Sequence, residues 1–170
     1  NGGETIYGLY YPPCNPDYGW QGAPPAIVQI HGGPTGQAGQ VFSAEIAYFT
    51  SLGYAYVRVN YRGSSGYGRR YLESLNGHWG EYDTEDAVTA ARYLAAEGLA
   101  DGKRMLITGG SAGGYVVLNV LCQYPDVFAA GACLYGVSNL YGIAADTHKL
   151  ELHYTDSLVG RLPEADEKYR

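Results

Sequence analysis

One serine stands among four glycines in ITGGSAGGY, residues 107–115. Gly109, Ser111 and Gly113 match the pattern G-x-S-x-G, in which a serine at a sharp strand-to-helix turn is the nucleophile of acyl transfer. An apolar run precedes this segment and a helical pattern follows it, which is the context the motif requires. The glycines favour this function because the backbone around such a nucleophile is strained and leaves no room for side chains.

Other glycine-rich motifs fit the same segment less well. A dinucleotide-binding G-x-G-x-x-G needs glycine at Ser111, and a phosphate-binding Walker loop needs lysine at Tyr115. A purely structural glycine-rich turn stays open as an alternative. The sequence therefore predicts Ser111 as a catalytic nucleophile.

A second motif, HGGP at 31–34, follows another apolar run. Acyl transfer needs two backbone N–H groups directed at the developing oxyanion, one from the residue after the nucleophile and one from an early HGG-type loop. Ala112 and Gly33 are the predicted oxyanion-hole residues. The alternative is an ordinary tight turn, but the order of the two motifs favours a nucleophile. His31 precedes the loop, so we do not expect it to be the base.

The elements that position these residues alternate between strands and helices. Strands are predicted at 26–30, 54–60, 104–109 and 129–135, and helices at 42–52, 84–97 and 115–123. Strands separated by helices imply parallel pairing with right-handed crossovers, hence an α/β fold with a doubly wound, mostly parallel sheet. Asp83 or Thr84 is the expected N-cap of the second helix.

Composition excludes several classes of function. The 170 residues carry a formal net charge of −6 without a basic cluster, so we expect no nucleic-acid partner. The apolar runs are too short to span a bilayer, so no membrane partner is expected either. Three cysteines at spacings that fit neither a disulfide framework nor a zinc site favour free thiols in a reducing, cytoplasmic compartment. The four histidines form no metal-binding motif, so neither a metal nor another cofactor is expected.

Four motifs together resemble the prolyl oligopeptidase family of serine peptidases, particularly its acylaminoacyl-peptidase and dipeptidyl-peptidase branch. They are HGGP, VNYRGSSGYGRRY (59–71), WGEYDTEDAV (79–88) and GGSAGGY (109–115). The resemblance runs from about Ile6 to the end of the chain. It implies an α/β-hydrolase catalytic domain that follows a β-propeller and releases short N-terminal units from short peptide substrates through an acyl-enzyme.

The resemblance also implies residues that bind substrate. Val137, Leu140 and Ile143 match the family's pocket for the side chain next to the scissile bond. The alternative for all three is an ordinary place in the core. We expect Arg62 to form an internal ion pair with Asp83 or Asp86 rather than to act in catalysis.

A triad needs an acid and a histidine after the serine in α/β-hydrolases. His148 and His153 follow Ser111, but neither comes after a predicted strand, and the family pattern places both partners beyond Arg170. We therefore expect residues 1–170 to be one partial catalytic domain, with a sheet incomplete at its C-terminus. Because the chain starts at Asn1, we expect a segment upstream of it, and the resemblance implies that this segment is the β-propeller.

An incomplete sheet would leave an open edge and exposed apolar surface, which predicts self-association or low stability of the 170 residues on their own. Two other functions stay open. A carboxylesterase uses the same serine turn and oxyanion loop, and a non-catalytic α/β module would use neither.

Overall fold

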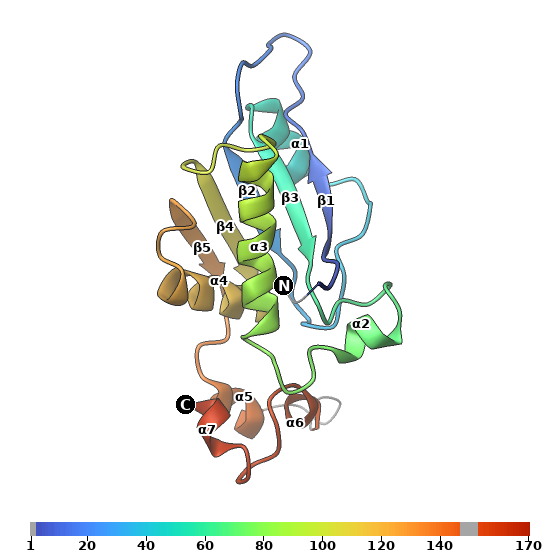
Figure 1. Cartoon of the computed structure of the whole chain (residues 1–170), viewed down its shortest axis with the longest axis vertical. Helices are drawn as coiled ribbons and strands as arrows, with labels where there is room; N and C mark the ends of the chain where they lie inside the picture. The colour runs from blue at the N-terminus through green and yellow to red at the C-terminus, as the bar shows by residue number, and fades with distance from the viewer. Residues whose placement is uncertain (1–2, 147–152) are drawn as a thin grey trace.

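The computed structural model describes residues 3–146 and 153–170, which contain a five-stranded sheet in the order β1-β3-β2-β4-β5 (Figure 1). The strands are β1 (Tyr7–Tyr11), β2 (Ala26–Ile30), β3 (Ala55–Asn60), β4 (Met105–Gly110) and β5 (Ala130–Leu134). The helices are α1 (Ala44–Ser51), α2 (Arg69–Glu73), α3 (Tyr82–Ala96), α4 (Ala112–Gln123), α5 (Leu140–Asp146), α6 (Tyr154–Leu158) and α7 (Asp166–Tyr169).

Strands β2 to β5 pair in parallel, which confirms the predicted α/β class and mostly parallel sheet. The four predicted strands and three predicted helices are present, with ends that differ by no more than three residues. Strand β1 was not predicted. It pairs antiparallel with β3 at the edge of the sheet, and most of its residues are exposed, so it lacks the apolar run that identified the others.

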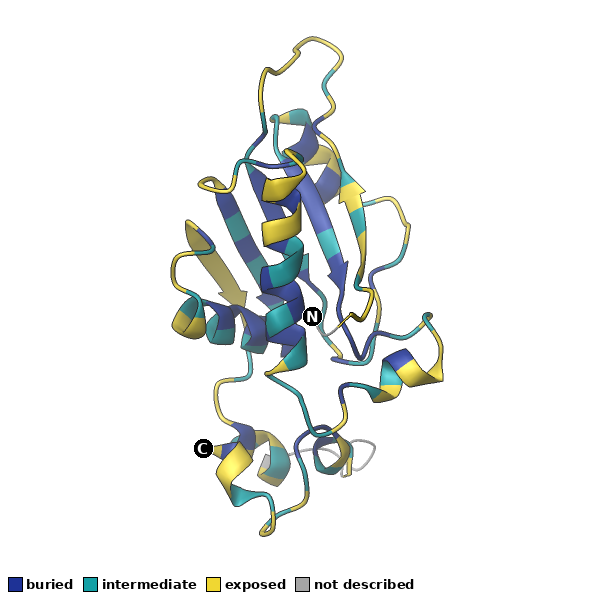
Figure 2. Cartoon of the chain, in the orientation of Figure 1, coloured by how far each residue is buried: buried dark blue, intermediate teal, exposed yellow. Residues whose placement is uncertain are grey.

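The sheet is covered on both faces, as a doubly wound fold requires. Alternate residues of a strand point to opposite faces. Val28 and Val57 belong to the main core with helices α3 and α4, whereas Ile27 and Tyr56 pack against Ile46 of α1 on the other side. The central strands are accordingly buried along their length (Figure 2).

The carboxyl ends of the parallel strands meet at one edge, and helices α5, α6 and α7 gather beyond it (Figure 1). The HGGP segment follows β2, Tyr61 and Arg62 follow β3, and Ser111 follows β4. In open α/β sheets ligands bind at this edge. The topology therefore brings the predicted nucleophile and the predicted oxyanion loop to the same end of the sheet.

The expected N-cap of α3 was wrong. The helix begins at Tyr82 with Glu81 as its cap, and Asp83 lies inside the first turn. The reason is that the Asp83 side chain points backward, where Oδ1 accepts hydrogen bonds from the amides of Gly80 (2.8 Å) and Thr84 (3.1 Å). It thereby satisfies one free N–H of the first helical turn, that of Thr84, and the N–H of Gly80 just before the helix.

Strand β5 is the other edge of the sheet. It pairs with β4 on one side, and all five of its residues are exposed. Leu134 and the adjacent Tyr135 keep 52% and 83% of their surface accessible. None of the helices in the described part of the chain has the length and apolar character needed to cross a membrane.

Candidate active site

Ser111 lies at the turn between β4 and α4 with φ 56° and ψ −122°. Positive φ is uncommon for a residue with a side chain, and such strain is characteristic of functional sites. The predicted strained strand-to-helix turn is thereby confirmed. Two backbone hydrogen bonds hold it, from the Ser111 amide to the Leu134 carbonyl (3.1 Å) and from the Val137 amide to the Ser111 carbonyl (3.3 Å). The Ser111 residue itself is exposed.

The two glycines of the motif are required by close backbone contacts. A Cβ on Gly109 would lie 2.5 Å from the Gly113 carbonyl oxygen, and a Cβ on Gly113 would overlap the Ile30 carbonyl oxygen. Side chains at these positions would push the serine turn away from the end of β2. The G-x-S-x-G pattern thus reflects how tightly α4 starts against the central strands.

The HGGP loop lies directly against the serine. A Cβ on Gly32 would come within 3.5 Å of the Ser111 Cβ and 3.1 Å of the Gly110 carbonyl oxygen. Gly33 adopts φ 120°, and a Cβ there would lie 2.9 Å from the Gly36 amide nitrogen. Bare backbone is therefore what lets the loop approach the serine.

The carbonyl groups of this loop are all engaged. Tyr61 donates its hydroxyl to the carbonyls of His31 (3.1 Å) and Pro34 (2.9 Å). The Gly32 carbonyl is 2.9 Å from His31 Nδ1, and the Gly33 carbonyl accepts from the Tyr154 hydroxyl at 2.6 Å.

The amides behave differently. Within the described residues, neither the Gly33 nor the Ala112 amide has a hydrogen-bond partner. Ala112 starts α4, and the first amides of a helix are free donors that favour negative charge. Two free donors beside an exposed serine can stabilise an oxyanion that forms on an acyl group attached to Ser111. The assignment of Gly33 and Ala112 to this function remains a prediction.

His31 is a structural residue of the loop. Its Nδ1 faces the Gly32 carbonyl and must carry the proton, so Nε2 accepts from the Ser64 hydroxyl at 2.8 Å. The ring stacks on Tyr61 with centroids 4.4 Å apart. Burial lowers the pKa of His31, against the opposing effect of the Gly32 hydrogen bond, so the ring stays neutral at pH 7. With both nitrogens engaged, His31 is unavailable as a base, in agreement with the sequence prediction.

The other described histidines also face groups other than Ser111. His78 Nδ1 lies 2.8 Å from Glu81 and His153 Nδ1 lies 3.1 Å from Asp156. His148 lies outside the described residues. Among the described residues, no group hydrogen-bonds to the Ser111 hydroxyl.

Arg62 forms the predicted internal ion pair, and its partner is Asp86. The guanidinium contacts Asp86 Oδ1 at 2.7 Å and Glu85 at 3.0 Å, and it stacks 4.0 Å from the ring of Tyr82. The Arg62 amide also donates to Asp86 at 2.8 Å. This network fixes the segment after β3 to α3, and that segment carries Ser64, the partner of His31.

The predicted substrate-binding residues lie in different surroundings. Val137 is half-buried against the core and follows the strand that holds the serine turn. Leu140 is buried in the main core at the start of α5, which favours the core alternative for this residue. Ile143 is exposed on the same helix. The substrate contacts of all three remain predictions.

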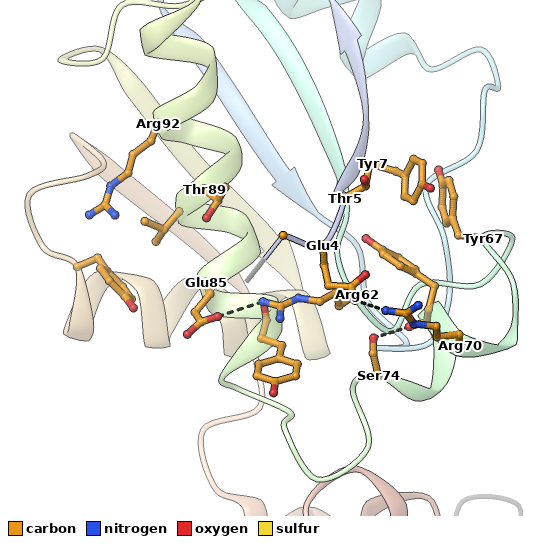
Figure 3. Close-up of a pocket in the computed structure, with 15 residues that line it drawn as sticks. Glu4, Thr5, Tyr7, Arg62, Tyr67, Arg70, Ser74, Glu85, Thr89 and Arg92 are labelled. Atoms are coloured by element: carbon orange, nitrogen blue, oxygen red, sulfur yellow. Dashed lines mark hydrogen bonds and ion pairs between the residues drawn. The ribbon is translucent and has the colours of Figure 1, made fainter. Parts of the chain in front are cut away.

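The cavity drawn in Figure 3 is separate from the site around Ser111. It has a volume of about 820 Å³ between the N-terminal segment, α2 and α3, and its polar walls include Glu4, Arg62, Arg70 and Glu85. In Figure 3 the Arg62 side chain points toward Glu85 on α3, while Arg70 pairs with Glu4 on the opposite side of the cavity. Neither Ser111 nor the HGGP loop lines this space.

Two tyrosines of the site were not anticipated from the sequence. Tyr61 directly follows the buried strand β3, so its place at the carboxyl edge was a usable signal. No sequence pattern pointed to Tyr154, because its contacts with Gly33 and Thr35 join residues about 120 positions apart.

The profile of the prolyl oligopeptidase family matches residues 40–170. The chain belongs to the prolyl oligopeptidase family. An acylamino-acid-releasing enzyme of Arabidopsis thaliana is 38% identical over 123 residues, which cover 72% of this chain and 16% of that enzyme.

Solved structures extend this family likeness to almost the whole chain. A puromycin hydrolase superposes with a TM-score of 0.94 at 44% identity, covering 99% of this chain and 26% of that one. The Pyrococcus horikoshii acylaminoacyl peptidase gives a TM-score of 0.83 at 32% identity, covering 97% of this chain and 26% of that one. The sequence thus spans 16% of the curated relative and 26% of each of these structures.

Proposed function

We propose that the chain carries the nucleophile and the oxyanion hole of a serine peptidase that releases short N-terminal units from peptides. The observation that supports this most directly is the exposed, strained Ser111 beside a loop whose carbonyls are engaged and whose Gly33 amide has no hydrogen-bond partner among the described residues. Membership of the prolyl oligopeptidase family supports the same reaction class.

In the proposed reaction, Ser111 Oγ attacks the carbonyl carbon of the scissile peptide bond. A general base takes the hydroxyl proton, and the amides of Gly33 and Ala112 bind the resulting oxyanion. Collapse of the tetrahedral adduct breaks the C–N bond, and the amine leaves with the proton returned by the base. Water then hydrolyses the acyl-enzyme by the same route.

The base and its orienting acid are proposed to come from outside residues 1–170. Support comes from the described histidines, which face Gly32, Ser64, Glu81 and Asp156 rather than Ser111. Residues 1–170 would then form one part of a catalytic domain. The share of the solved structures that this chain covers, 26%, agrees with that proposal.

Val137, Leu140 and Ile143 are proposed to line the pocket for the substrate side chain. The Val137 amide bonds to the Ser111 carbonyl, so this segment begins beside the nucleophile. The substrates to test first are aminoacyl amides, because the structure with 44% identity is a puromycin hydrolase. N-acylated and dipeptidyl nitroanilides follow, as suggested by the acylaminoacyl and dipeptidyl relatives.

A cytoplasmic location is proposed from the three cysteines. Cys14, Cys122 and Cys133 are free and exposed, a state that a reducing compartment preserves.

The deciding experiment uses the full-length protein that the gene encodes. Wild type, Ser111→Ala and the matched control Ser51→Ala, on α1 at the far face of the sheet, are treated with a fluorophosphonate and assayed on aminoacyl, acylaminoacyl and dipeptidyl nitroanilides and on a nitrophenyl ester. The proposal requires labelling and amide hydrolysis that Ser111→Ala abolishes and Ser51→Ala preserves. Hydrolysis of the ester alone would identify a carboxylesterase, and no labelling at all would identify a non-catalytic module.

A further inference from the structure

The loop that holds Gly33 is anchored from two sides by tyrosine hydroxyls. Tyr61 reaches it from the end of β3 and bonds to His31 and Pro34. Tyr154 reaches it from α6, near the other end of the chain. The first contact is between neighbouring elements of the sheet, whereas the second depends on how the C-terminal helices dock.

The hydrogen bonds of Tyr154 use its hydroxyl fully. The proton goes to the Gly33 carbonyl at 2.6 Å, because a carbonyl oxygen can only accept. The hydroxyl oxygen therefore accepts from the Thr35 amide (3.1 Å) and from the Thr35 hydroxyl (2.5 Å). With its single proton committed to Gly33, this hydroxyl does not itself serve as an oxyanion donor.

The Gly33–Pro34 peptide group has an unusual dependence on that bond. Proline has no N–H, so the carbonyl of Gly33 is the one polar group through which this peptide plane can be fixed. Gly33 itself has φ 120°, a region in which glycine is free to move. The Gly33 amide lies in the preceding peptide group, between Gly32 and Gly33, whose carbonyl faces His31 Nδ1 at 2.9 Å. The Tyr154 bond acts on that amide across the Gly33 Cα, by fixing the peptide plane that follows it, and its loss would remove the anchor on that side.

Helix α6 offers the hydroxyl from a fixed position. Leu158 keeps 1% of its surface accessible and belongs to the main core, and Thr155 is also buried. The carbonyls of Ser157 and Leu158 accept from the amides of Gly77 and Trp79 at 3.0 and 3.3 Å. The C-terminal end of α6 is therefore hydrogen-bonded to the segment that leads into α3.

We propose that Tyr154 is a positioning residue for catalysis: its hydroxyl holds the Gly33–Pro34 peptide group and, across the Gly33 Cα, helps to keep the Gly33 amide directed at the oxyanion on Ser111. This inference rests on the proposed function. It adds a residue from α6 to a site otherwise built from the ends of β2, β3 and β4. Its consequence is that the transition state, and not the ground-state complex, depends on the Tyr154 hydroxyl.

The test compares Tyr154→Phe with Tyr141→Phe in the full-length protein. Tyr141 is a matched control, because its hydroxyl bonds to Asp166 within the same C-terminal segment and away from the loop. For Tyr154→Phe we expect kcat to fall about 10- to 100-fold with KM changed less than about threefold, since removal of a whole oxyanion donor costs about 10²- to 10³-fold. Tyr141→Phe should change neither constant.

A peptidyl trifluoromethyl ketone, whose adduct with a serine carries an oxyanion, gives a second readout. Its affinity should fall by the same factor as kcat/KM in Tyr154→Phe, while the affinity of a peptide product stays constant. Active sites are counted by fluorophosphonate titration, so partial misfolding is separated from slower chemistry. A raised KM with unchanged kcat, or an unchanged ketone affinity, would overturn the inference.

Failure of the proposed function is recognised separately. If Ser111→Ala keeps activity, the nucleophile assignment is wrong. If Ser111→Ala is inactive while Tyr154→Phe matches Tyr141→Phe, the serine chemistry stands and the positioning inference is wrong. Should Tyr154→Phe not fold, Thr35→Val is used in its place. It removes one partner of the same hydroxyl, and unaltered ketone affinity in that variant would count against the inference.

Discussion

The Arg62 guanidinium and the Asp86 carboxylate form a buried ion pair with a shortest distance of 2.7 Å, and the Asp86 side chain has no accessible surface. The backbone amide of Arg62 donates to the same carboxylate at 2.8 Å. A single side chain of α3 therefore fixes both the side chain and the main chain of the residue that follows Tyr61. The oxyanion loop depends on this pair indirectly, through Tyr61 and Ser64.

Replacing Asp86 by Asn is expected to destabilise the protein by about 3 kcal/mol. This is the low end for breaking a buried pair, because Glu85 still contacts the guanidinium. Urea unfolding of the purified protein measures the change. Asp101→Asn, which breaks the more exposed pair with Arg104, is the control and should have a much smaller effect. An equal loss of unfolding free energy in both variants would contradict the larger contribution expected of the buried pair.

Replacing Ser111 by Gly is expected to stabilise the protein. A non-glycine residue in such a backbone conformation costs about 1–3 kcal/mol of strain, which glycine would relieve. Glycine in turn loses more conformational entropy on folding, which costs about 0.5–1 kcal/mol. A net gain of about 1 kcal/mol should appear in thermal or urea unfolding. Ser111→Ala retains a Cβ at φ 56° and should show no such gain. A Gly variant no more stable than the Ala variant would mean that the turn is unstrained.

The sequence predicted what depends on local patterns. Buried parallel strands have continuous apolar runs, so β2 was predicted at its observed ends, 26–30. The turn at Ser111 was predicted from its local glycine pattern, although the contacts that require Gly109 and Gly113 include the Ile30 carbonyl at the end of β2.

Features that depend on tertiary contact were missed. Strand β1 is an exposed edge strand that is defined by its register with β3. Tyr154 reaches Gly33 only after the C-terminal helices have docked on the segment before α3. The start of α3 was predicted wrongly for a different reason. An acidic residue can accept a hydrogen bond from an amide of the first turn from inside the helix as well as from the cap position.

Asp83 is expected to make stability fall as pH rises. Burial raises its pKa to about 7, against the opposing effect of the Gly80 and Thr84 amides, from the usual 3.8. The folded state binds the proton more tightly than the unfolded state, so stability declines as pH rises from the usual pKa toward the folded one. The slope is about 1.4 kcal/mol per pH unit where the folded and unfolded states differ by one bound proton. Asp86, Tyr61 and Tyr115 face the same region.

Asp83→Asn keeps the shape of the neutral acid and should remove this dependence. Urea unfolding at pH 5 and pH 8 measures it: the variant should exceed wild type at pH 8 by more than at pH 5. For Asp101 the sign is opposite: hydrogen bonds from Lys103 and Arg104 lower its pKa, so its contribution to stability is lost only as pH falls below the usual 3.8, and the control Asp101→Asn should leave the difference between pH 5 and pH 8 unchanged. A wild-type stability that is flat from pH 5 to 8 would show that Asp83 is ionised throughout.

The 170 residues on their own are expected to self-associate through β5. This edge strand presents unpaired backbone groups and exposed apolar side chains, which is a template for strand pairing. Sedimentation velocity should detect species larger than the 18.3 kDa monomer. Ala132→Lys places a charge on the exposed strand and should reduce association. A monodisperse wild-type monomer would contradict this prediction.

The 170 residues on their own are also expected to lack peptidase and esterase activity at enzyme-like rates. A serine hydroxyl is a weak nucleophile without a base, and an oxyanion hole with substrate binding retains a rate only about 10³- to 10⁴-fold above that in water. His31 is neutral and engaged, and His153, with 78% of its side chain exposed, pairs with Asp156. Nitroanilide and nitrophenyl ester assays with fluorophosphonate labelling test this, and the full-length protein and its Ser111→Ala variant calibrate them. Rapid stoichiometric labelling of the short chain that His148→Ala or His153→Ala abolishes would identify a local histidine as the base and place the general base within these 170 residues.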